Sequence, residues 1–219
     1  MKAVIFDVDN TLYDTKQYFY GGFRKISMYL SEKYKFDNEK IVKDLIKIWE
    51  ENTSMYPHIF DDFLKKYNIE EDVMKIVRVF NSYDGDLKPY DDVIGLLKTL
   101  RDKDYRLGII TDGNVQRQKN KIKKLGVASF FDYILYTKEV GCSKPSTIPF
   151  EKMMKELEVK PDETFYIGDN PVLDFEGAKK TGMKTVRVLK GEFKNLKTSE
   201  YVDFETDSFK EILSIIDER

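Results

Sequence analysis

The fold follows from one stretch near the start of the sequence, Ala3-Val4-Ile5-Phe6-Asp7-Val8-Asp9-Asn10-Thr11-Leu12-Tyr13. Its first four residues are all apolar, which predicts a strand buried on both faces, as in the middle of a parallel sheet. If the backbone stays extended beyond them, Asp7 and Asp9 point to the same side. Two adjacent carboxylates repel each other unless a cation lies between them, so the pair predicts a divalent metal site, with an acidic surface turn as the alternative. Asn10 tolerates left-handed backbone geometry, which allows a sharp exit from the strand.

The composition restricts the chemistry of any site in this chain. Of the 219 residues, 41% are hydrophobic and 35% are charged, enough to bury a core and to keep the surface polar. The single Cys and the single His exclude an internal disulfide and a metal site built from either residue type, and they disfavour a Ser-His-Asp triad. We expect structural roles for Cys142 and His58. A metal would be bound by oxygen, which favours Mg²⁺.

Charge and hydropathy limit the partners and the location. The net charge of −2, from 37 basic and 39 acidic residues, gives no reason to expect a nucleic-acid partner. No apolar run reaches the roughly 18 residues of a membrane span, and the first predicted strand begins at residue 3. We therefore expect a cytoplasmic protein with no signal peptide and no membrane partner.

The rhythm of apolar residues divides the chain into two parts. Residues 15–86 show helical spacing throughout, with three breaks that predict four helices. From residue 87 onward, strands alternate with helices, which predicts a parallel sheet covered on both faces. The predicted fold class is therefore α/β. Residues 1–14 and 87–219 form a Rossmann-like core, and residues 15–86 form an inserted helical domain.

The core pattern predicts further strands after the first one. We expect four of them at residues 105–110, 133–136, 164–167 and 185–189, and a short one near Tyr201-Val202. The helices expected between and after them include 91–103, which follows Pro89, and 209–216.

Polar residues follow the predicted strands at positions far apart in the sequence. In an open parallel sheet, ligands bind at the carboxyl ends of the strands, where the connections change direction. That rule brings together six side chains, which are Asp7, Asp9, Thr111, Lys144, Asp169 and Asp174. Four carboxylates and one lysine sum to −3, and one Mg²⁺ ion reduces this to about −1. Gly113 and Gly168 would allow close approach of the backbone to a phosphoryl group.

Four short segments in this order resemble the motifs of the haloacid dehalogenase superfamily. They are Asp7-Val8-Asp9-Asn10-Thr11, Thr111-Asp112-Gly113, Ser143-Lys144-Pro145 and Gly168-Asp169-Asn170-Pro171-Val172-Leu173-Asp174. Each segment alone is a weak signal, but four at the ends of successive predicted strands are specific. The helical insertion between the first two segments resembles the cap of one branch of that superfamily. Closure of such a cap would exclude water during attack on phosphorus.

The resemblance implies roles for the acidic residues. It implies that Asp7 is the nucleophile, which attacks phosphorus and forms an aspartyl-phosphate. It also implies that Asp9 protonates the leaving oxygen and then deprotonates the attacking water. Mg²⁺ is then the expected cofactor, bound by Asp7, the main-chain carbonyl of Asp9 and Asp169, with Asp174 in or near its coordination shell.

The resemblance also implies a phosphate-binding set. Thr111 would donate a hydrogen bond to a phosphoryl oxygen, beside the N–H groups of Asp112 and Gly113, and Lys144 would pair with the nucleophile and the phosphate. Structural alternatives remain for three residues. Thr111 could be a helix N-cap, Lys144 a solvated surface lysine, and Asp174 an acid favoured by a helix dipole.

The function expected from these residues is hydrolysis of a small phosphorylated metabolite by a Mg²⁺-dependent phosphatase. Within the same superfamily, a phosphomutase and a carbon–halogen hydrolase are alternatives. Departure of a halide needs no proton donor, so the presence of Asp9 argues against the hydrolase. Outside enzymes, a phosphorylatable signalling module also combines an acidic cluster with Thr and Lys, but it is shorter and lacks a long insertion after its first strand.

Overall fold

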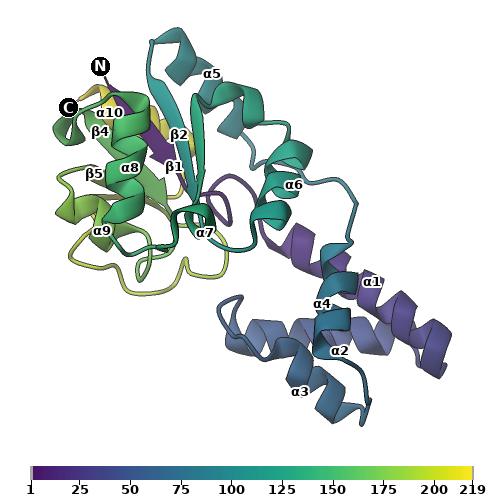
Figure 1. The fold of residues 1–219 in the computed structure, drawn as a ribbon. Coiled ribbons are helices and arrows are strands. Elements are labelled where there is room, and N and C mark those ends of the chain that lie inside the picture. Colours follow the sequence, from purple (N-terminus) through teal and green to yellow (C-terminus); the bar gives the residue numbers. More distant parts are fainter. Residues whose placement is uncertain (1, 219) are drawn as a thin grey trace. The chain divides into compact units, whose positions relative to one another are not determined.

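The computed structural model describes residues 2–218, and they form two compact units (Figure 1). The sheet unit comprises Met1–Asp14 and Leu87–Arg219, and the helical unit comprises Thr15–Asp86. The first unit holds a parallel sheet with helices on both of its faces, as the sequence predicts. The site-forming motifs quoted above all lie in the sheet unit.

The sheet of this unit has six strands in the order β3-β2-β1-β4-β5-β6, and every neighbouring pair is parallel. The strands are β1 (Ala3–Phe6), β2 (Arg106–Thr111), β3 (Tyr133–Tyr136), β4 (Thr164–Gly168), β5 (Lys184–Val188) and β6 (Phe204–Thr206). β1, purple in Figure 1, lies between β2 and β4, and all four of its residues are fully buried. The run of four apolar residues is explained by this central position, since neither face of β1 meets water.

Helices cover the two faces of this sheet. Those of the sheet unit are α5 (Val93–Asp102), α6 (Val115–Leu125), α7 (Thr137–Val140), α8 (Ile148–Leu157), α9 (Phe175–Lys180) and α10 (Phe209–Asp217). α8 and α9 pack on the face that carries Ala3 and Ile5. Phe6 points to the other face, where its ring meets that of Phe131 edge to face at 6.1 Å. Phe131 directly follows a short 3₁₀ turn, Ala128–Phe130, that packs against α5 and α6.

Five of the predicted strands begin and end within one residue of the observed ones, but the predicted position of the sixth strand is wrong. We expected it near Tyr201-Val202, and it lies at Phe204–Thr206. Thr185 explains the difference, because its hydroxyl donates to the carbonyl of Tyr201 at 2.7 Å and accepts from the N–H of Asp203 at 2.9 Å. These side-chain bonds hold residues 201–203 beside β5, and the strand ladder begins only after them.

The start of α5 also differs from the prediction. We expected a helix from residue 91, directly after Pro89, but the helix begins at Val93. Asp92, the residue before it, has a φ of 69°, which lies in the left-handed region and prevents a continuous helix there.

The helical unit contains the four helices predicted from the periodicity. They are α1 (Lys16–Tyr34), α2 (Asn38–Asn52), α3 (Ile59–Lys66) and α4 (Val73–Asn81). Its core is aromatic. Phe19 stacks on Trp49 with ring centroids 5.1 Å apart, and Phe23 and Phe80 lie 5.8 Å apart. Packing of these rings against one another contributes to a compact unit in a segment of only about 70 residues.

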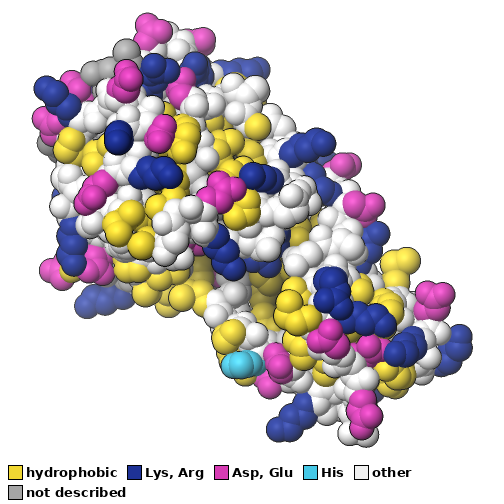
Figure 2. Space-filling model, in the orientation of Figure 1, with side chains coloured by type: hydrophobic (Ala, Val, Ile, Leu, Met, Phe, Trp, Pro, Cys, Tyr) yellow, Lys and Arg dark blue, Asp and Glu magenta, His cyan; other side chains and the backbone are white. Residues whose placement is uncertain are grey.

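The surface of the chain carries both charges. In the face drawn in Figure 2, Lys and Arg side chains are interspersed with Asp and Glu over the sheet unit, with no extended area of one sign. No described helix combines the length and the apolar character that a bilayer crossing requires.

Candidate active site

The site is built at the carboxyl ends of β1 and β4, where the strand order changes direction. Asp7 follows β1 and Asp169 follows β4, and the N–H of Asp7 donates to the carbonyl of Ile167 at 2.9 Å. Asp174 lies five residues after Asp169. The three carboxyl groups are buried, and each offers an oxygen atom within 4.8 Å of the others.

Asp174 fixes the backbone after β4. Its Oδ2 atom accepts hydrogen bonds from the N–H groups of Asp169 at 3.1 Å and Asn170 at 2.9 Å. Gly168 is required beside it, because a Cβ atom at that position would lie 2.5 Å from the same oxygen. Asp174 therefore does more than complement a helix dipole, since it orders the loop that presents Asp169.

Lys144 is the cation of this carboxylate group. Its Nζ atom lies 2.7 Å from Asp7 Oδ1, 2.6 Å from Asp174 Oδ1 and 3.2 Å from the Tyr166 hydroxyl. Burial alone would lower its pKa, but the two carboxylates raise the pKa of Lys144 well above its ordinary value. Only 6% of the residue is exposed, so the alternative of a solvated surface lysine is wrong.

Negative charge exceeds positive charge around Lys144. Burial, with the neighbouring carboxylates, raises the pKa of Asp7 to about 7 and that of Asp169 well above its ordinary value. Asp169 Oδ2 is buried and has no hydrogen-bond partner among the described residues. Such a buried oxygen, facing two other carboxylates, fits a bound cation with oxygen ligands.

Asp9 lies in a different set of interactions. Its Oδ1 accepts from Lys121 Nζ and the Tyr13 hydroxyl, both at 2.7 Å, and its Oδ2 accepts from Lys121 at 2.8 Å and Gln118 Nε2 at 3.0 Å. Burial alone would raise its pKa, but Lys121 and these hydrogen bonds lower the pKa of Asp9 to about 2. The strand ends at Phe6 and Asn10 has a φ of 57°, so the sharp exit expected at Asn10 is confirmed.

The end of β2 supplies the predicted phosphate-binding segment. Thr111 Oγ1 accepts a hydrogen bond from Gln118 Nε2 at 2.5 Å, which leaves the hydroxyl hydrogen free to be donated elsewhere. Asp112 accepts from the Thr137 hydroxyl at 2.5 Å and lies 3.8 Å from Lys144 Nζ. Gly113 has a φ of 105°, a conformation that favours glycine.

Thr111 is not the N-cap of the helix that follows it. That position belongs to Asn114, whose side chain accepts a hydrogen bond from the N–H of Arg117 at 3.0 Å. The structural alternative for Thr111 is therefore wrong, and its buried hydroxyl remains available for a ligand.

Five residues of this region were missed in the sequence, and two of them are Tyr13 and Tyr166, whose hydroxyl groups contact Asp9 and Lys144. Gln118 and Lys121 lie three residues apart on α6, so both reach Asp9 from the same face of the helix. The buried Arg187 donates to the Asp169 carbonyl at 3.2 Å and pairs with Glu205 at 2.8 Å. A charged residue inside the apolar strand 185–189 was a usable signal for Arg187. α6 is so polar that neither Gln118 nor Lys121 stands out.

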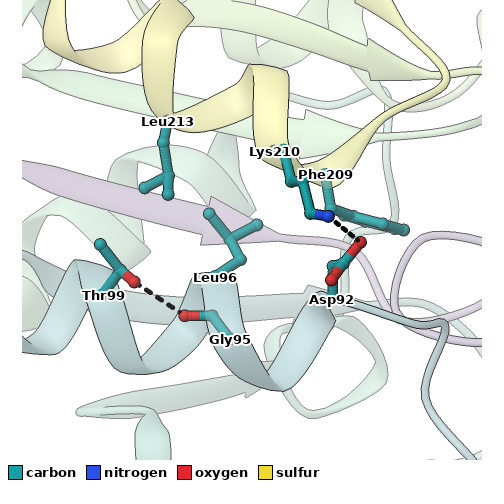
Figure 3. Close-up of a pocket in the computed structure, with 7 residues that line it drawn as sticks. All are labelled: Asp92, Gly95, Leu96, Thr99, Phe209, Lys210 and Leu213. Carbon is teal, nitrogen blue, oxygen red and sulfur yellow. Dashed lines mark hydrogen bonds and ion pairs between the residues drawn. The ribbon is translucent and has the colours of Figure 1, made fainter.

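A groove between α5 and α10 is a separate feature of the sheet unit (Figure 3). It encloses about 200 Å³, less than the roughly 300–1,000 Å³ typical of ligand pockets. Lys210 Nζ lies 3.7 Å from Asp92 Oδ2 across the groove. Its other lining residues are Gly95, Leu96, Thr99, Phe209 and Leu213, and no predicted site residue is among them. The candidate active site therefore remains the one at the carboxyl ends of the strands.

Comparison with known proteins gives one family. The model of the haloacid dehalogenase-like hydrolases matches residues 4–188. The chain is 33% identical to a glyceraldehyde 3-phosphate phosphatase of Methanocaldococcus jannaschii, over 99% of this chain and 97% of that protein. It is 31% identical to a protein of the same name from Methanopyrus kandleri, over 100% of this chain and 98% of that protein. A crystal structure of a HAD phosphatase from Thermococcus onnurineus matches with a TM-score of 0.69 and 25% identity, over 99% and 98% of the two chains.

Proposed function

The chain belongs to the haloacid dehalogenase-like hydrolase family and is an enzyme of its phosphatase branch, and we propose that it hydrolyses a small phosphate monoester with Mg²⁺ through an aspartyl-phosphate. The observation that carries this proposal is the convergence of Asp7, Asp169 and Asp174 on Lys144 at the switch point of the sheet. A nucleophilic carboxylate, a cation site and a fixed ammonium group are what phosphoryl transfer to an aspartate requires.

Asp7 is the proposed nucleophile. Lys144 holds its Oδ1, and no described residue forms a hydrogen bond with its Oδ2, so that oxygen is free to attack phosphorus. The phosphorus–oxygen bond to the leaving group breaks as the bond to Asp7 forms, and water then releases inorganic phosphate and restores the carboxylate.

Mg²⁺ is the proposed cofactor. Asp7 and Asp169 would bind it, with the Asp9 carbonyl, and Asp174 would lie in or near its coordination shell. When bound, the ion would supply positive charge to the phosphoryl group, in addition to that of Lys144.

Asp9 is the proposed acid and base. It would give a proton to the leaving oxygen and later take one from the attacking water. Its carboxylate accepts four hydrogen bonds, which come from Tyr13, Gln118 and Lys121. Gln118 also donates to Thr111, so one amide group orients both the proposed acid and the hydroxyl proposed to bind a phosphoryl oxygen.

The substrate that we propose is glyceraldehyde 3-phosphate. Two relatives that match almost the whole chain carry the name of that activity. We further propose that the helical unit selects the substrate, as an inserted cap would do.

A panel of phosphate esters with Mg²⁺, assayed by release of inorganic phosphate, tests this proposal. We expect the highest kcat/KM for glyceraldehyde 3-phosphate among sugar phosphates, nucleoside monophosphates and phosphoglycolate, with no activity in excess chelator. Isomerised product without phosphate release would identify a mutase instead. Full activity in chelator would contradict the proposed use of Mg²⁺.

A further inference from the structure

Arg117 is an arginine of the sheet unit that lacks an anionic partner. It lies in the first turn of α6 and is half-buried. Its Nε atom is enclosed, and its guanidinium group forms no hydrogen bond or ion pair with any described residue. By contrast, Arg101 and Arg106 pair with Asp132, and Arg187 pairs with Glu205. An enclosed donor of this kind costs free energy unless an acceptor binds to it.

The guanidinium group lies beside the proposed phosphate-binding segment. Its Nη2 atom is 3.3 Å from the position that a Cβ atom would take on Gly113. Arg117 and Lys121 are four residues apart on α6 and therefore share a face of the helix. Since Lys121 bonds to Asp9, Arg117 stands on the Asp9 side of the site.

The two positive charges on this face oppose each other. Like charges four residues apart destabilise a helix, and Arg117 contributes to the lowered pKa of Lys121, after burial. Lys121 is compensated by Asp9, whereas Arg117 is not. An anion bound at Arg117 would offset the repulsion between Arg117 and Lys121 and would accept a hydrogen bond from the guanidinium group. A carboxylate suits this position, because a guanidinium group binds it through two parallel hydrogen bonds.

We propose that Arg117 forms a subsite for the leaving group of the substrate, and that it binds oxygen atoms on an oxidised terminal carbon. This inference rests on the proposed function, which places the phosphoryl group at Thr111, Asp112 and Gly113. Asp9 marks the side from which the leaving oxygen departs, and Arg117 lies on that side. The ligand class is a short phosphate ester that ends in a carbonyl or carboxylate group, and the carboxylate binds most tightly because it is charged.

Two ligands that share their phosphoryl group and three carbons test the subsite. 3-Phosphoglycerate ends in a carboxylate and glycerol 3-phosphate in an alcohol. Both would be titrated calorimetrically into the Asp7→Asn variant with Mg²⁺, where turnover does not interfere. A charge-assisted hydrogen-bonded pair contributes about 1.5–3 kcal/mol, so we expect the carboxylate ligand to bind about 10- to 100-fold more tightly.

Substitution of Arg117 should abolish this preference. With Arg117→Gln added, we expect Kd for 3-phosphoglycerate to rise about 10- to 100-fold and Kd for glycerol 3-phosphate to change less than about 3-fold. Arg117→Lys should restore part of the preference, because it keeps the positive charge but lacks the paired N–H donors of the guanidinium group. Lys123→Gln removes the same charge from an exposed position of α6 and should leave both Kd values unchanged.

Three results would overturn the inference. Equal weakening of both ligands by Arg117→Gln would place Arg117 at the phosphoryl group, and no change would make it a surface residue. Failure of both ligands to bind would contradict the subsite and the proposed function together. If the wild-type enzyme released no phosphate from any ester but the Arg117-dependent preference were present, the proposed function alone would fail.

Discussion

The two buried lysines of the site have different surroundings. Lys144 lies between Asp7 and Asp174, with Asp112 at 3.8 Å and Asp169 close by, so one positive charge faces four carboxylates. Lys121 faces the single carboxylate of Asp9, to which Tyr13 and Gln118 also donate. The group around Lys144 therefore carries an excess of negative charge, whereas Lys121 and Asp9 form a balanced pair.

This difference separates a place for a cation from a place for an oriented carboxylate. Around Lys144, burial and like charges raise the pKa of Asp7 to about 7. Around Lys121, the hydrogen bonds and the ammonium group overcome burial and lower the pKa of Asp9 to about 2. The first group gains free energy from an added cation, whereas the second is complete without one.

The largest expected effect follows from removing the proposed nucleophile. Asp7→Asn keeps the size of the side chain and can still accept a hydrogen bond from Lys144, but an amide does not attack phosphorus. We expect turnover to fall by at least about 10⁴-fold, and mass spectrometry should show no phosphorylated enzyme. Circular dichroism should show an unchanged fold. Near-normal turnover would mean that another residue is the nucleophile.

Asp169→Asn should abolish the response of stability to Mg²⁺. In chelator, we expect a higher Tm for the variant, because a buried carboxylate with a raised pKa opposes folding when it is ionised. Mg²⁺ should raise the Tm of the wild type and have little effect on the variant.

The pH dependence of the same variant provides a control. Above the ordinary carboxyl pKa of about 4, folded Asp169 holds its proton while the unfolded chain releases it, so stability falls as pH rises. The metal-free wild type should therefore lose more stability than Asp169→Asn between pH 4 and 7 in urea unfolding. Parallel curves would contradict the excess of negative charge around Lys144.

Lys121→Met tests the balanced group and should have a smaller effect. Removal of the Lys121 ammonium group leaves the Asp9 carboxylate without its charged partner. Because the Asp9 side chain is 33% exposed, we expect the free energy of unfolding to fall by about 2–3 kcal/mol, less than for a fully buried pair. The double variant Asp9→Asn/Lys121→Met should recover most of that loss. Lys119 also lies on α6, and Lys119→Met breaks its exposed pair with Glu139 of α7, which should cost less than about 1 kcal/mol. Equal costs for the two lysine variants would show that Asp9 and Lys121 do not depend on each other.

The sequence was informative where strand order determines position. Asp7, Asp169 and Lys144 could be gathered because strand ends of a parallel sheet meet at one edge, whatever the packing of the helices. Lys121 and Gln118 could not, because α6 is polar on several faces and only its rotation in the structure shows which face meets Asp9. The position of the sixth strand was predicted wrongly for a related reason. The hydroxyl of Thr185 forms hydrogen bonds with the backbone of Tyr201 and Asp203 in place of strand-to-strand bonds. Side chains that substitute for the backbone leave no period in the sequence.

The proposed reaction has two steps, in which Asp7 attacks phosphorus and Asp9 transfers protons. Rapid-mixing absorbance of Asp9→Asn with p-nitrophenyl phosphate tests this most directly. Nitrophenolate leaves without a proton, so the first step should stay fast. The second step lacks its base and should slow by about 10²- to 10⁴-fold. We predict a burst of about one equivalent of nitrophenol per active enzyme, followed by a stall with phosphorylated enzyme. Equal slowing of aryl and alkyl esters with no burst would contradict the proposed role of Asp9.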